Sequence, residues 1–335
     1  MKESAGKLSF FKMIVTTKKN MNNIFLTGGA GFIGSSLADS LLSQGYKIVC
    51  LDNFDNYYDK TIKLKNIQNA IENPNFKLVD GDIRDRNLLS KLFGENDFQL
   101  IVHLAAKAGV RPSVESPQDY FEVNINGTIN ILEVAKEYGV KKMVFASSSS
   151  VYGNNKKVPF SETDFVDYPI SPYAASKKAG ELICYTYHEL YQMDITCLRF
   201  FTVYGPRQRP DLAIHKFAKL ILGNKSVPVY GDGSFKRDFT YIDDIVFGIN
   251  QAIKNLNGFH VYNLGNSRTI SVLEMIAELE KALDKKVQID FRPLQPGDVK
   301  LTFADISSAK KELDYNPKFD FRSGIEKFVE WLKIN

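Results

Sequence analysis

The sequence has few cysteines, little excess charge and no long apolar run, and each shortage excludes a class of protein. Its 335 residues contain only three cysteines. An odd number without a Cys-x-x-Cys pair argues against a disulfide scaffold and favours buried thiols in a reducing compartment, the cytoplasm. The formal net charge is only +4 and the basic residues are scattered, so we expect no nucleic-acid partner. No apolar stretch approaches the ~20 residues that span a bilayer, so we expect no membrane insertion.

The most informative pattern lies at residues 23–34. A short apolar run gives way to closely spaced glycines and then to apolar residues at helical spacing, which predicts a strand, a tight turn and a helix. Glycine lets the backbone approach a pyrophosphate, and the helix N-terminus offers it unpaired N–H groups. The turn therefore predicts a dinucleotide site, although an ordinary loop would also explain glycines. The residues expected to contribute are Gly28, Gly31, Phe32, Ile33 and Gly34.

The next two predicted strands end at acidic residues. The strand at 46–51 runs into Asp52 and Asn53, where a carboxylate would accept hydrogen bonds from the adenosine ribose and repel a 2′-phosphate. This favours NAD over NADP. The strand at 76–80 is followed by Asp82 and Ile83, which we expect beside the adenine. The alternative at both ends is an acidic residue in a plain turn.

The order of the patterns predicts an α/β fold. Between residues 22 and 205, short apolar strands alternate with amphipathic helices, which is typical of a Rossmann fold, a doubly wound parallel sheet covered on both faces. Strands are expected at 23–27, 46–51, 76–80, 100–104, 141–146 and 195–201. Residues 206–335 are predicted to form a smaller C-terminal α/β substrate-binding lobe, with helices near 211–222, 243–254, 271–283 and 322–333. We expect chain crossings between the two parts, and a disordered extension at 1–21.

The fourth predicted strand ends in a segment of small side chains. Its backbone would pass close to a bound dinucleotide, whereas we interpret His103, just before it, as a packed strand residue. Asn124, in a helix that starts near Pro117, is expected to pin the neighbouring strand ends through its amide. A surface position for this Asn is the alternative. The residues of the segment are Leu104, Ala105, Ala106 and Lys107.

The residues expected to perform chemistry are Tyr173 and Lys177. They lie four apart at the start of a strong helical pattern, so their side chains share one face. Lowering a phenol pKa from about 10 to about 7 requires about 4 kcal/mol. One nearby cation supplies roughly 1 to 3 pKa units, so the positive nicotinamide of bound NAD+ would have to supply the rest. An exposed pair is the alternative, but the glycine turn and a serine cluster at 147–150 favour catalysis.

Together these patterns resemble the extended short-chain dehydrogenase/reductases, specifically the nucleotide-sugar epimerases. The resemblance extends from Asn22 to the C-terminus and rests on segments 27–34, 52–53, 103–106, 147–153, 173–177 and 237–244. It implies tightly held NAD, a nucleoside diphosphate gripped by the C-terminal lobe, and a catalytic trio of Ser148, Tyr173 and Lys177. It also implies a homodimer through a four-helix bundle built from the helices near 117–138 and 173–191.

Smaller differences within this family point to a uronate substrate. Related 4,6-dehydratases carry an Asp-Glu pair beside the catalytic hydroxyl, where this chain has Ser149 and Ser150. Many sugar epimerases carry Asn where it has Thr202. Segments 108–113, 199–211 and 295–299 look like those of UDP-glucuronate 4-epimerases. Hydrogen bonds from these three hydroxyls and charge from Arg209 would hold the carboxylate of a 4-keto uronate near the ketone plane and so prevent loss of CO2.

The resemblance also places the rest of the substrate. Arg237 looks like the family's diphosphate ligand, and Val229 lies in the segment that resembles the strand packed on uracil. We therefore expect NAD-dependent conversion of UDP-glucuronate to UDP-galacturonate, without a metal. A 4-epimerase of UDP-glucose or UDP-N-acetylglucosamine, a UDP-uronate decarboxylase and a non-catalytic NAD-sensing protein remain as alternatives.

Overall fold

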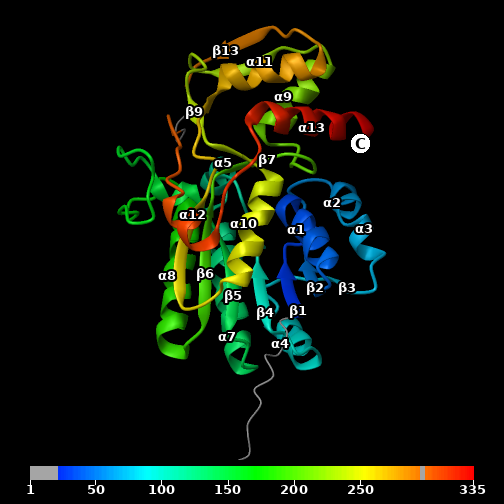
Figure 1. Ribbon diagram of the computed structural model, residues 1–335, viewed down its shortest axis with the longest axis vertical. Helices are drawn as coiled ribbons and strands as arrows, with labels where there is room; N and C mark the ends of the chain where they lie inside the picture. Colours follow the sequence, from blue (N-terminus) through cyan, green and yellow to red (C-terminus); the bar gives the residue numbers. More distant parts are fainter. Residues whose placement is uncertain (1–21, 295–298) are drawn as a thin grey trace, which may run out of the picture.

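The structure, a computed structural model, describes residues 22–294 and 299–335. Its centre is a sheet of seven parallel strands in the order β11-β6-β5-β4-β1-β2-β3 (Figure 1). The strand order reverses between β1 and β4, as in a doubly wound sheet, so the predicted Rossmann fold is confirmed. The strands are β1 (Asn23–Thr27), β2 (Lys47–Asp52), β3 (Phe76–Asp80), β4 (Leu100–His103), β5 (Lys142–Ser148), β6 (Asp194–Phe200) and β11 (Phe259–Leu264).

The seventh strand, β11, was not among the predicted strands. It comes from the C-terminal half of the chain and pairs with β6 at the edge of the sheet. Its first three residues are only half-buried, and His260 and Asn263 interrupt its apolar pattern. A half-exposed edge strand gives a weak sequence signal, whereas the six predicted strands agree with the structure to within two residues.

Helices cover both faces of the sheet. Because side chains alternate along a strand, Ile24 and Leu26 of β1 pack into the core beneath α1 and α10, while Phe25 packs into the core beneath α4, α7 and α8. Short helices continue from β2 and cover the edge of the sheet. The helices of this layer are α1 (Phe32–Ser43), α2 (Lys60–Asn66), α3 (Gln68–Ile71), α4 (Arg86–Glu95), α7 (Gly127–Glu137), α8 (Pro172–Tyr191) and α10 (Ile242–Lys254).

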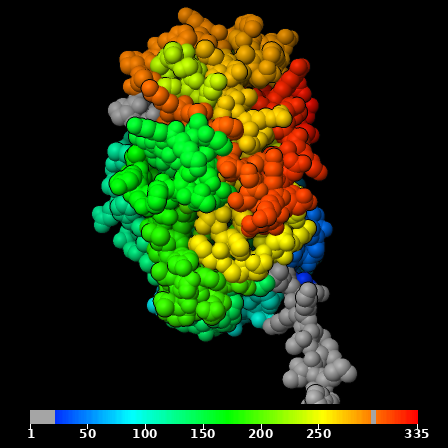
Figure 2. All heavy atoms as spheres, turned by 60° about the vertical axis from the view of Figure 1, so that its left-hand side comes forward, coloured from blue at the N-terminus to red at the C-terminus, as the bar shows by residue number. Residues whose placement is uncertain are grey.

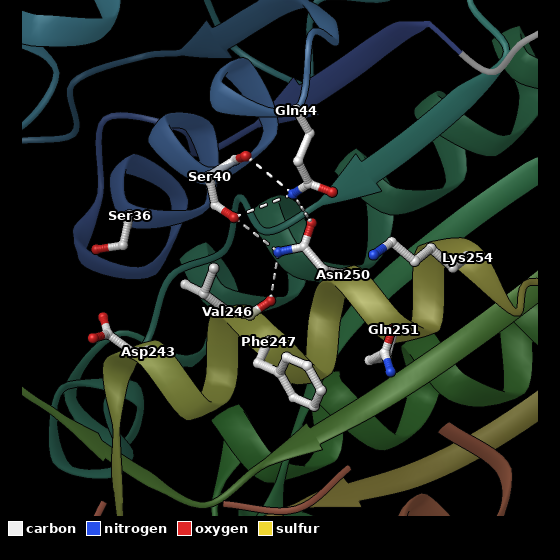
Figure 3. A pocket seen from close by; sticks show the side chains of 9 residues that line it. All are labelled: Ser36, Ser40, Gln44, Asp243, Val246, Phe247, Asn250, Gln251 and Lys254. Atoms are coloured by element: carbon white, nitrogen blue, oxygen red, sulfur yellow. Dashed lines mark hydrogen bonds between the residues drawn. The ribbon is translucent and has the colours of Figure 1, made fainter. Parts of the chain in front are cut away.

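A polar groove of about 380 Å³ runs between α1 and α10 (Figure 3). Asn250 spans it by donating to Ser40 Oγ at 3.1 Å and accepting from Gln44 Nε2 at 2.9 Å. These bonds fix α10, which comes from the second half of the chain, against the helix that follows the glycine turn. The groove lies on the outside of the sheet layer, between the two helices, and the residues expected to perform chemistry are not among those that line it.

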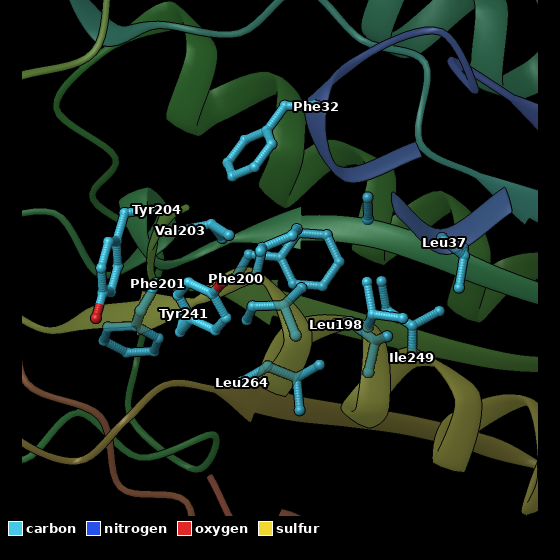
Figure 4. Close-up of a cluster of buried hydrophobic side chains, with 14 of the residues drawn as sticks. Phe32, Leu37, Leu198, Phe200, Phe201, Val203, Tyr204, Tyr241, Ile249 and Leu264 are labelled. Carbon is cyan, nitrogen blue, oxygen red and sulfur yellow. The ribbon is translucent and has the colours of Figure 1, made fainter. Parts of the chain in front are cut away.

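Most of the remaining elements form a lobe above the carboxyl ends of the strands (Figure 1). One apolar cluster runs from the sheet into this lobe and contains side chains from both sides of residue 205, among them Leu198, Tyr204 and Tyr241 (Figure 4). The lobe elements are β7 (Thr202–Tyr204), α9 (Ala213–Leu222), β8 (Val227–Tyr230), β9 (Lys236–Arg237), β10 (Phe239–Tyr241), β12 (Ile270–Ser271), α11 (Val272–Leu283), β13 (Ile289–Arg292) and α13 (Phe321–Ile334). The short helix α12 (Ser307–Leu313) packs instead on β11 and α10 of the sheet layer. The predicted extension at 1–21 and most of segment 295–299 lie outside the described residues.

Candidate active site

The glycine turn leaves no room for side chains. Gly28 has φ of +71°, and a Cβ there would stand 2.7 Å from the backbone nitrogen of Ala105. A Cβ on Gly34 would stand 2.2 Å from the carbonyl oxygen of Gly28. The turn therefore packs tightly against both the start of α1 and the segment after β4, and it exposes backbone N–H groups where a pyrophosphate would lie. These residues fit the dinucleotide that the sequence predicts.

Asp52, at the end of β2, is bonded to this turn. Its carboxylate accepts hydrogen bonds from Ala30 N and from Phe54 N, both at 2.9 Å. Burial raises the pKa of Asp52, with the two backbone bonds acting in the opposite direction. Each carboxylate oxygen keeps a further lone pair for a ribose hydroxyl. The residue thus ties the glycine turn to the neighbouring strand end and remains available as the expected ribose ligand.

Asp82, which is expected beside adenine, is bonded to Asn53 at the end of the neighbouring strand. Asn53 Nδ2 donates to Asp82 Oδ2 at 2.9 Å, and Arg84 forms a two-pronged ion pair with the same carboxylate. The hydrogen bond from Arg84 lowers the pKa of Asp82 to about 2. Ile83 is buried, and a Cβ on Gly127 of α7 would meet it at 2.5 Å. The turn after β3 is therefore rigid and charged at neutral pH.

Asn124 holds the segment after β4, as predicted, and it does so from a π-helical turn. The helix expected near 117–138 is divided into α6 (Pro117–Phe121), a π-helix at Glu122–Asn126 and then α7, and a further short helix, α5 (Val110–Glu115), precedes it. Asn124 accepts from Lys107 N at 2.8 Å and donates to Lys107 O at 3.0 Å and to Ser176 Oγ at 2.9 Å. Such wider turns often occur at functional sites and are not visible in an apolar pattern.

His103 is a packed strand residue, as interpreted from the sequence. Its ring nitrogens contact Thr27 Oγ1 at 2.7 Å and Thr128 Oγ1 at 3.0 Å. Burial lowers the pKa of His103 to about 3, so the ring is neutral at pH 7. The backbone that follows is fixed by Ala105 N, which donates to Thr27 Oγ1 at 3.2 Å.

Ser148 stands at the carboxyl end of β5 and caps a short 3₁₀ turn, residues Ser149–Tyr152. Its Oγ accepts from Ser150 N and donates to Ser150 Oγ, both at 3.1 Å. Ser149 and Ser150 are half-buried at the same strand end. Because β5 pairs with β6 up to Phe200, Thr202 on β7 follows the neighbouring strand end. The three hydroxyls that sequence reasoning grouped thus lie on adjoining segments.

Tyr173 and Lys177 lie in the first two turns of α8. Burial raises the pKa of the Tyr173 phenol, while a hydrogen bond with Ser148 and the charge of Arg209 oppose that change. Lys177 Nζ donates to the carbonyl oxygen of Ala146 at 2.7 Å and lies 5.3 Å from the centre of the Phe145 ring. Burial lowers the pKa of Lys177 to about 8. The helix that carries the phenol therefore also holds an ammonium group against the end of β5.

Arg209 approaches this site from the turn after β7, in a cluster that sequence reasoning missed. Its guanidinium makes two hydrogen bonds of 3.0 Å to the Asp211 carboxylate and lies over the Tyr57 ring, 5.2 Å from its centre. Tyr57 OH in turn donates to Asp211 Oδ2 at 3.2 Å. The aromatic residue comes from the loop after β2, so the cluster joins the cofactor side to the substrate side. The only sequence signal for this cluster was the position of Asp211, two residues after Arg209.

The residues expected on the nucleotide lie in the C-terminal lobe. Arg237 is on β9, which pairs with β12, and its Nη1 donates to Lys236 O at 3.0 Å. Val229 on β8 is only 1% exposed, so its side chain belongs to the core and its backbone is what remains for a ligand. Arg207, the neighbour of Arg209 in the same turn, forms an ion pair with Asp39 of α1 at 2.7 Å.

Within residues 22–294 and 299–335, no helix has both the length and the apolar character needed to cross a bilayer. Over the same residues, no cluster of three His, Cys, Asp or Glu side chains is arranged to hold a metal ion.

Comparison with known proteins identifies the family. The family model described as GDP-mannose 4,6 dehydratase matches residues 25–328. The chain is 43% identical over 316 residues to a UDP-glucuronate 4-epimerase of Thermodesulfobacterium geofontis, with 94% of this chain and 97% of that relative covered. The chain belongs to the nucleotide-sugar epimerases of the extended short-chain dehydrogenase/reductase family. The predicted resemblance is confirmed.

Solved structures agree with this epimerase family. The UDP-glucuronic acid 4-epimerase of Bacillus cereus, solved with UDP-glucuronic acid and NAD, matches with a TM-score of 0.88 and 39% identity over 93% of this chain and 99% of that one. The UDP-glucose 4-epimerase of Thermotoga maritima, solved with UDP-glucose, matches with a TM-score of 0.87 and 32% identity, again covering 93% and 99%. The same fold thus serves acidic and neutral sugars, so the substrate must be argued from side chains.

Proposed function

We propose that this epimerase converts UDP-glucuronate to UDP-galacturonate with bound NAD. The observation that carries the proposal is the strand end at Ser148, where Ser149 and Ser150 stand instead of the acidic pair that dehydratases of this fold carry. Both serines are half-buried, and Arg209 lies close enough to Tyr173 to influence its pKa. Hydroxyls and a guanidinium are suited to hold a carboxylate, and they cannot supply the acid and base needed for dehydration.

The chain's own residues support proton transfer at the sugar 4-hydroxyl. Tyr173 takes that proton, Ser148 holds the oxygen, and Lys177 supplies positive charge behind the phenol. NAD, when bound, supplies the acceptor and later the donor of the C4 hydride. Tyr173 then gives its proton back to the C4 oxygen as the same hydride returns to the other face of the 4-keto sugar, so protons and electrons balance without a second substrate.

The uronate makes a particular demand on the site. Its 4-keto form is a β-keto acid, which loses CO2 when the carboxylate bond stands perpendicular to the ketone plane. Ser149, Ser150 and Thr202 donate hydrogen bonds that keep the carboxylate near that plane, and Arg209 contributes charge. The role of these residues is therefore as much to prevent decarboxylation as to bind the substrate.

We propose a division of labour between the two lobes. Residues 22–205 hold NAD through the glycine turn, Asp52 and the segment pinned by Asn124, whereas residues 206–335 hold the nucleotide. Arg237 binds the diphosphate and the backbone around Val229 packs on uracil. The β11 strand and α10 are the chain crossings that return from the second part to complete the first.

Proton NMR of UDP-glucuronate with purified protein and no added NAD tests the proposal. We expect the anomeric signals of UDP-galacturonate to appear without a pentose product, because the cofactor travels with the protein. A pentose signal would mean decarboxylation and a wrong role for the three hydroxyls. Conversion of UDP-glucose or UDP-N-acetylglucosamine, with UDP-glucuronate unchanged, would assign the chain to a neutral-sugar epimerase.

We also propose that the protein is a cytoplasmic homodimer. The outer face of α8 and the neighbouring α6 present large apolar side chains to solvent, including Phe121 at 39%, Leu182 at 55% and Leu190 at 70% exposure. In Figure 2 this face is turned forward, and α8 lies in its green surface. The three cysteines are buried and unpaired, which suits a reducing compartment. Light scattering of the wild type and of Leu190→Glu tests the dimer: we expect twice the chain mass for the first and a monomer for the second.

A further inference from the structure

A buried ion pair lies directly behind the catalytic side chains. Glu181 of α8 and Arg199 of β6 are 3% and 2% exposed. Arg199 Nε donates to Glu181 Oε1 at 2.7 Å and Nη2 donates to Oε2 at 2.8 Å, which is a two-pronged geometry. Ser147 Oγ donates to the same Oε1 at 2.6 Å. One carboxylate therefore joins the ends of β5 and β6 to α8.

The pair reaches further into the fold on its other side. Arg199 Nη1 donates to Tyr152 OH at 2.9 Å, and Tyr152 OH donates to Asn263 Oδ1 of β11 at 2.7 Å. A helix can be packed on a sheet with apolar side chains alone, often with equal or greater stability. The ion pair and its hydrogen bonds instead fix the positions of β5, β6, β11 and α8 relative to one another.

We propose that Glu181 is a positioning residue of the epimerase, which joins the end of β5, through Ser147, to the helix that carries Tyr173. The proposal rests on the function proposed above. Ser147 directly precedes Ser148, and Glu181 lies one helical turn after Lys177 on the same side of α8. A shift of either element would change the separation between the serine hydroxyl and the phenol.

Glu181 also contributes to the charge around Lys177, whose pKa is lowered mainly by burial. The titratable groups that act on this ammonium are His103 of β4, Cys197 of β6, and Cys184 and Glu181 of α8. Burial leaves His103, Cys197 and Tyr173 uncharged at pH 7. The carboxylate of Glu181, itself bonded to Arg199 and 3.6 Å from Lys178 Nζ, therefore favours the charged form of Lys177.

Two variants test the proposal on the full-length protein with NAD bound. In Glu181→Gln we expect the carbon-13 NMR titration of Lys177, assigned with Lys177→Met, to move down by about one pH unit. In Ser147→Ala, which keeps the ion pair, we expect kcat to fall roughly 10- to 100-fold while KM for UDP-glucuronate stays within about twofold. Glu280→Gln is the matched control, because it alters a carboxylate of α11 that is bonded to Lys286, far from the site. It should change neither the Lys177 titration nor kcat.

Failure of the positioning role can be distinguished from failure of the proposed function. An unchanged Lys177 midpoint in Glu181→Gln, or a wild-type kcat in Ser147→Ala, would overturn the positioning role. If Glu181→Gln does not fold, Ser147→Ala decides, since it leaves both charges paired. Because the lysine titration needs no substrate, it tests Glu181 even if the wild type fails to convert UDP-glucuronate, which would remove the proposed function alone.

Discussion

Two buried carboxylates flank the candidate site, and they are held in opposite ways. Glu181, one helical turn after Lys177 on α8, faces the guanidinium of Arg199. Asp238, in the C-terminal lobe, accepts instead from the backbone N–H groups of Asn266 at 2.7 Å, Ser267 at 3.0 Å and Ala304 at 3.1 Å. Each carboxylate gathers segments that are far apart in the sequence.

The difference appears in their pKa values. Burial alone would raise the pKa of Glu181, but the hydrogen bonds and charge of Arg199 outweigh it and leave the pKa below its usual value. Burial raises the pKa of Asp238 to about 6, because backbone dipoles only partly replace the lost water. The charge of a cation offsets the free-energy cost of burying a carboxylate. Backbone amides fix the orientation of the carboxylate but leave part of that cost.

We call Glu181 and the side chains bonded to it the catalytic frame, and Asp238 and its backbone donors the substrate frame. The two frames serve different parts of the site. Asp238 directly follows Arg237, and its carbonyl oxygen accepts from Thr202 N at 3.0 Å. It thus joins the two segments that we propose to hold the diphosphate and the carboxylate of the substrate. Glu181 lies on the helix that carries the proposed base, Tyr173. Changes in the two regions should therefore separate catalysis, stability and pH dependence.

The largest effect is expected from Tyr173→Phe, which removes the proposed base and leaves both carboxylate frames intact. Turnover should fall roughly 100- to 10,000-fold, because a general base typically contributes that much. NAD content and the unfolding midpoint should stay near wild type. Epimerisation is measured by the NMR assay and cofactor content by release on denaturation. Substantial residual turnover would show that Tyr173 is not the base.

The next effect is on stability and concerns the catalytic frame. Glu181→Leu leaves Arg199 buried without its partner, which should cost about 3 to 5 kcal/mol in the free energy of unfolding. The double change Glu181→Leu with Arg199→Met removes both charges and should regain most of that loss, while turnover stays low. Urea unfolding of the two proteins makes the comparison. A double variant no more stable than the single one would contradict it.

We expect a change of similar size in the free energy of unfolding with pH, caused by Asp238 in the substrate frame. Because the pKa of Asp238 is raised to about 6 in the folded protein, its protonated form favours folding below about pH 4. This advantage is lost as the pH rises through about 6, a change of about 3 kcal/mol. Asp238→Asn does not titrate, so the wild type should lose stability relative to this variant between about pH 4 and pH 7. A difference that is independent of pH would mean that Asp238 is ionised throughout.

The fold was predictable to the extent that its signals were local. The glycine turn, the strand ends and the apolar runs identified six strands of the sheet and the family. The edge strand β11 was missed because its first three residues are only half-buried, and the π-turn at Asn124 was missed because an apolar pattern does not reveal a single wider turn within a helical stretch.

The site was predictable where residues lie close in sequence or match a family motif. Tyr173 with Lys177 is such a case, whereas the contacts of Arg209 with Tyr57 join residues 152 positions apart. Glu181 was visible one turn beyond Lys177, but its partner Arg199 is on another strand. Long-range pairing of charges depends on how helices and strands pack, which single-sequence patterns do not encode.

The smallest effect should come from Lys178→Ala, which removes the outer partner of Glu181. Lys178 is 3.6 Å from the carboxylate, and its side chain is 20% exposed. Partly exposed ion pairs contribute about 0 to 1 kcal/mol, and Arg199 already makes both strong hydrogen bonds to this carboxylate. Unfolding free energy and kcat should therefore both stay close to wild type. A large loss in this variant would mean that Lys178 and Arg199 both stabilise the charge of Glu181. Glu181 would then differ from Asp238 in having two cationic partners where Asp238 has backbone donors.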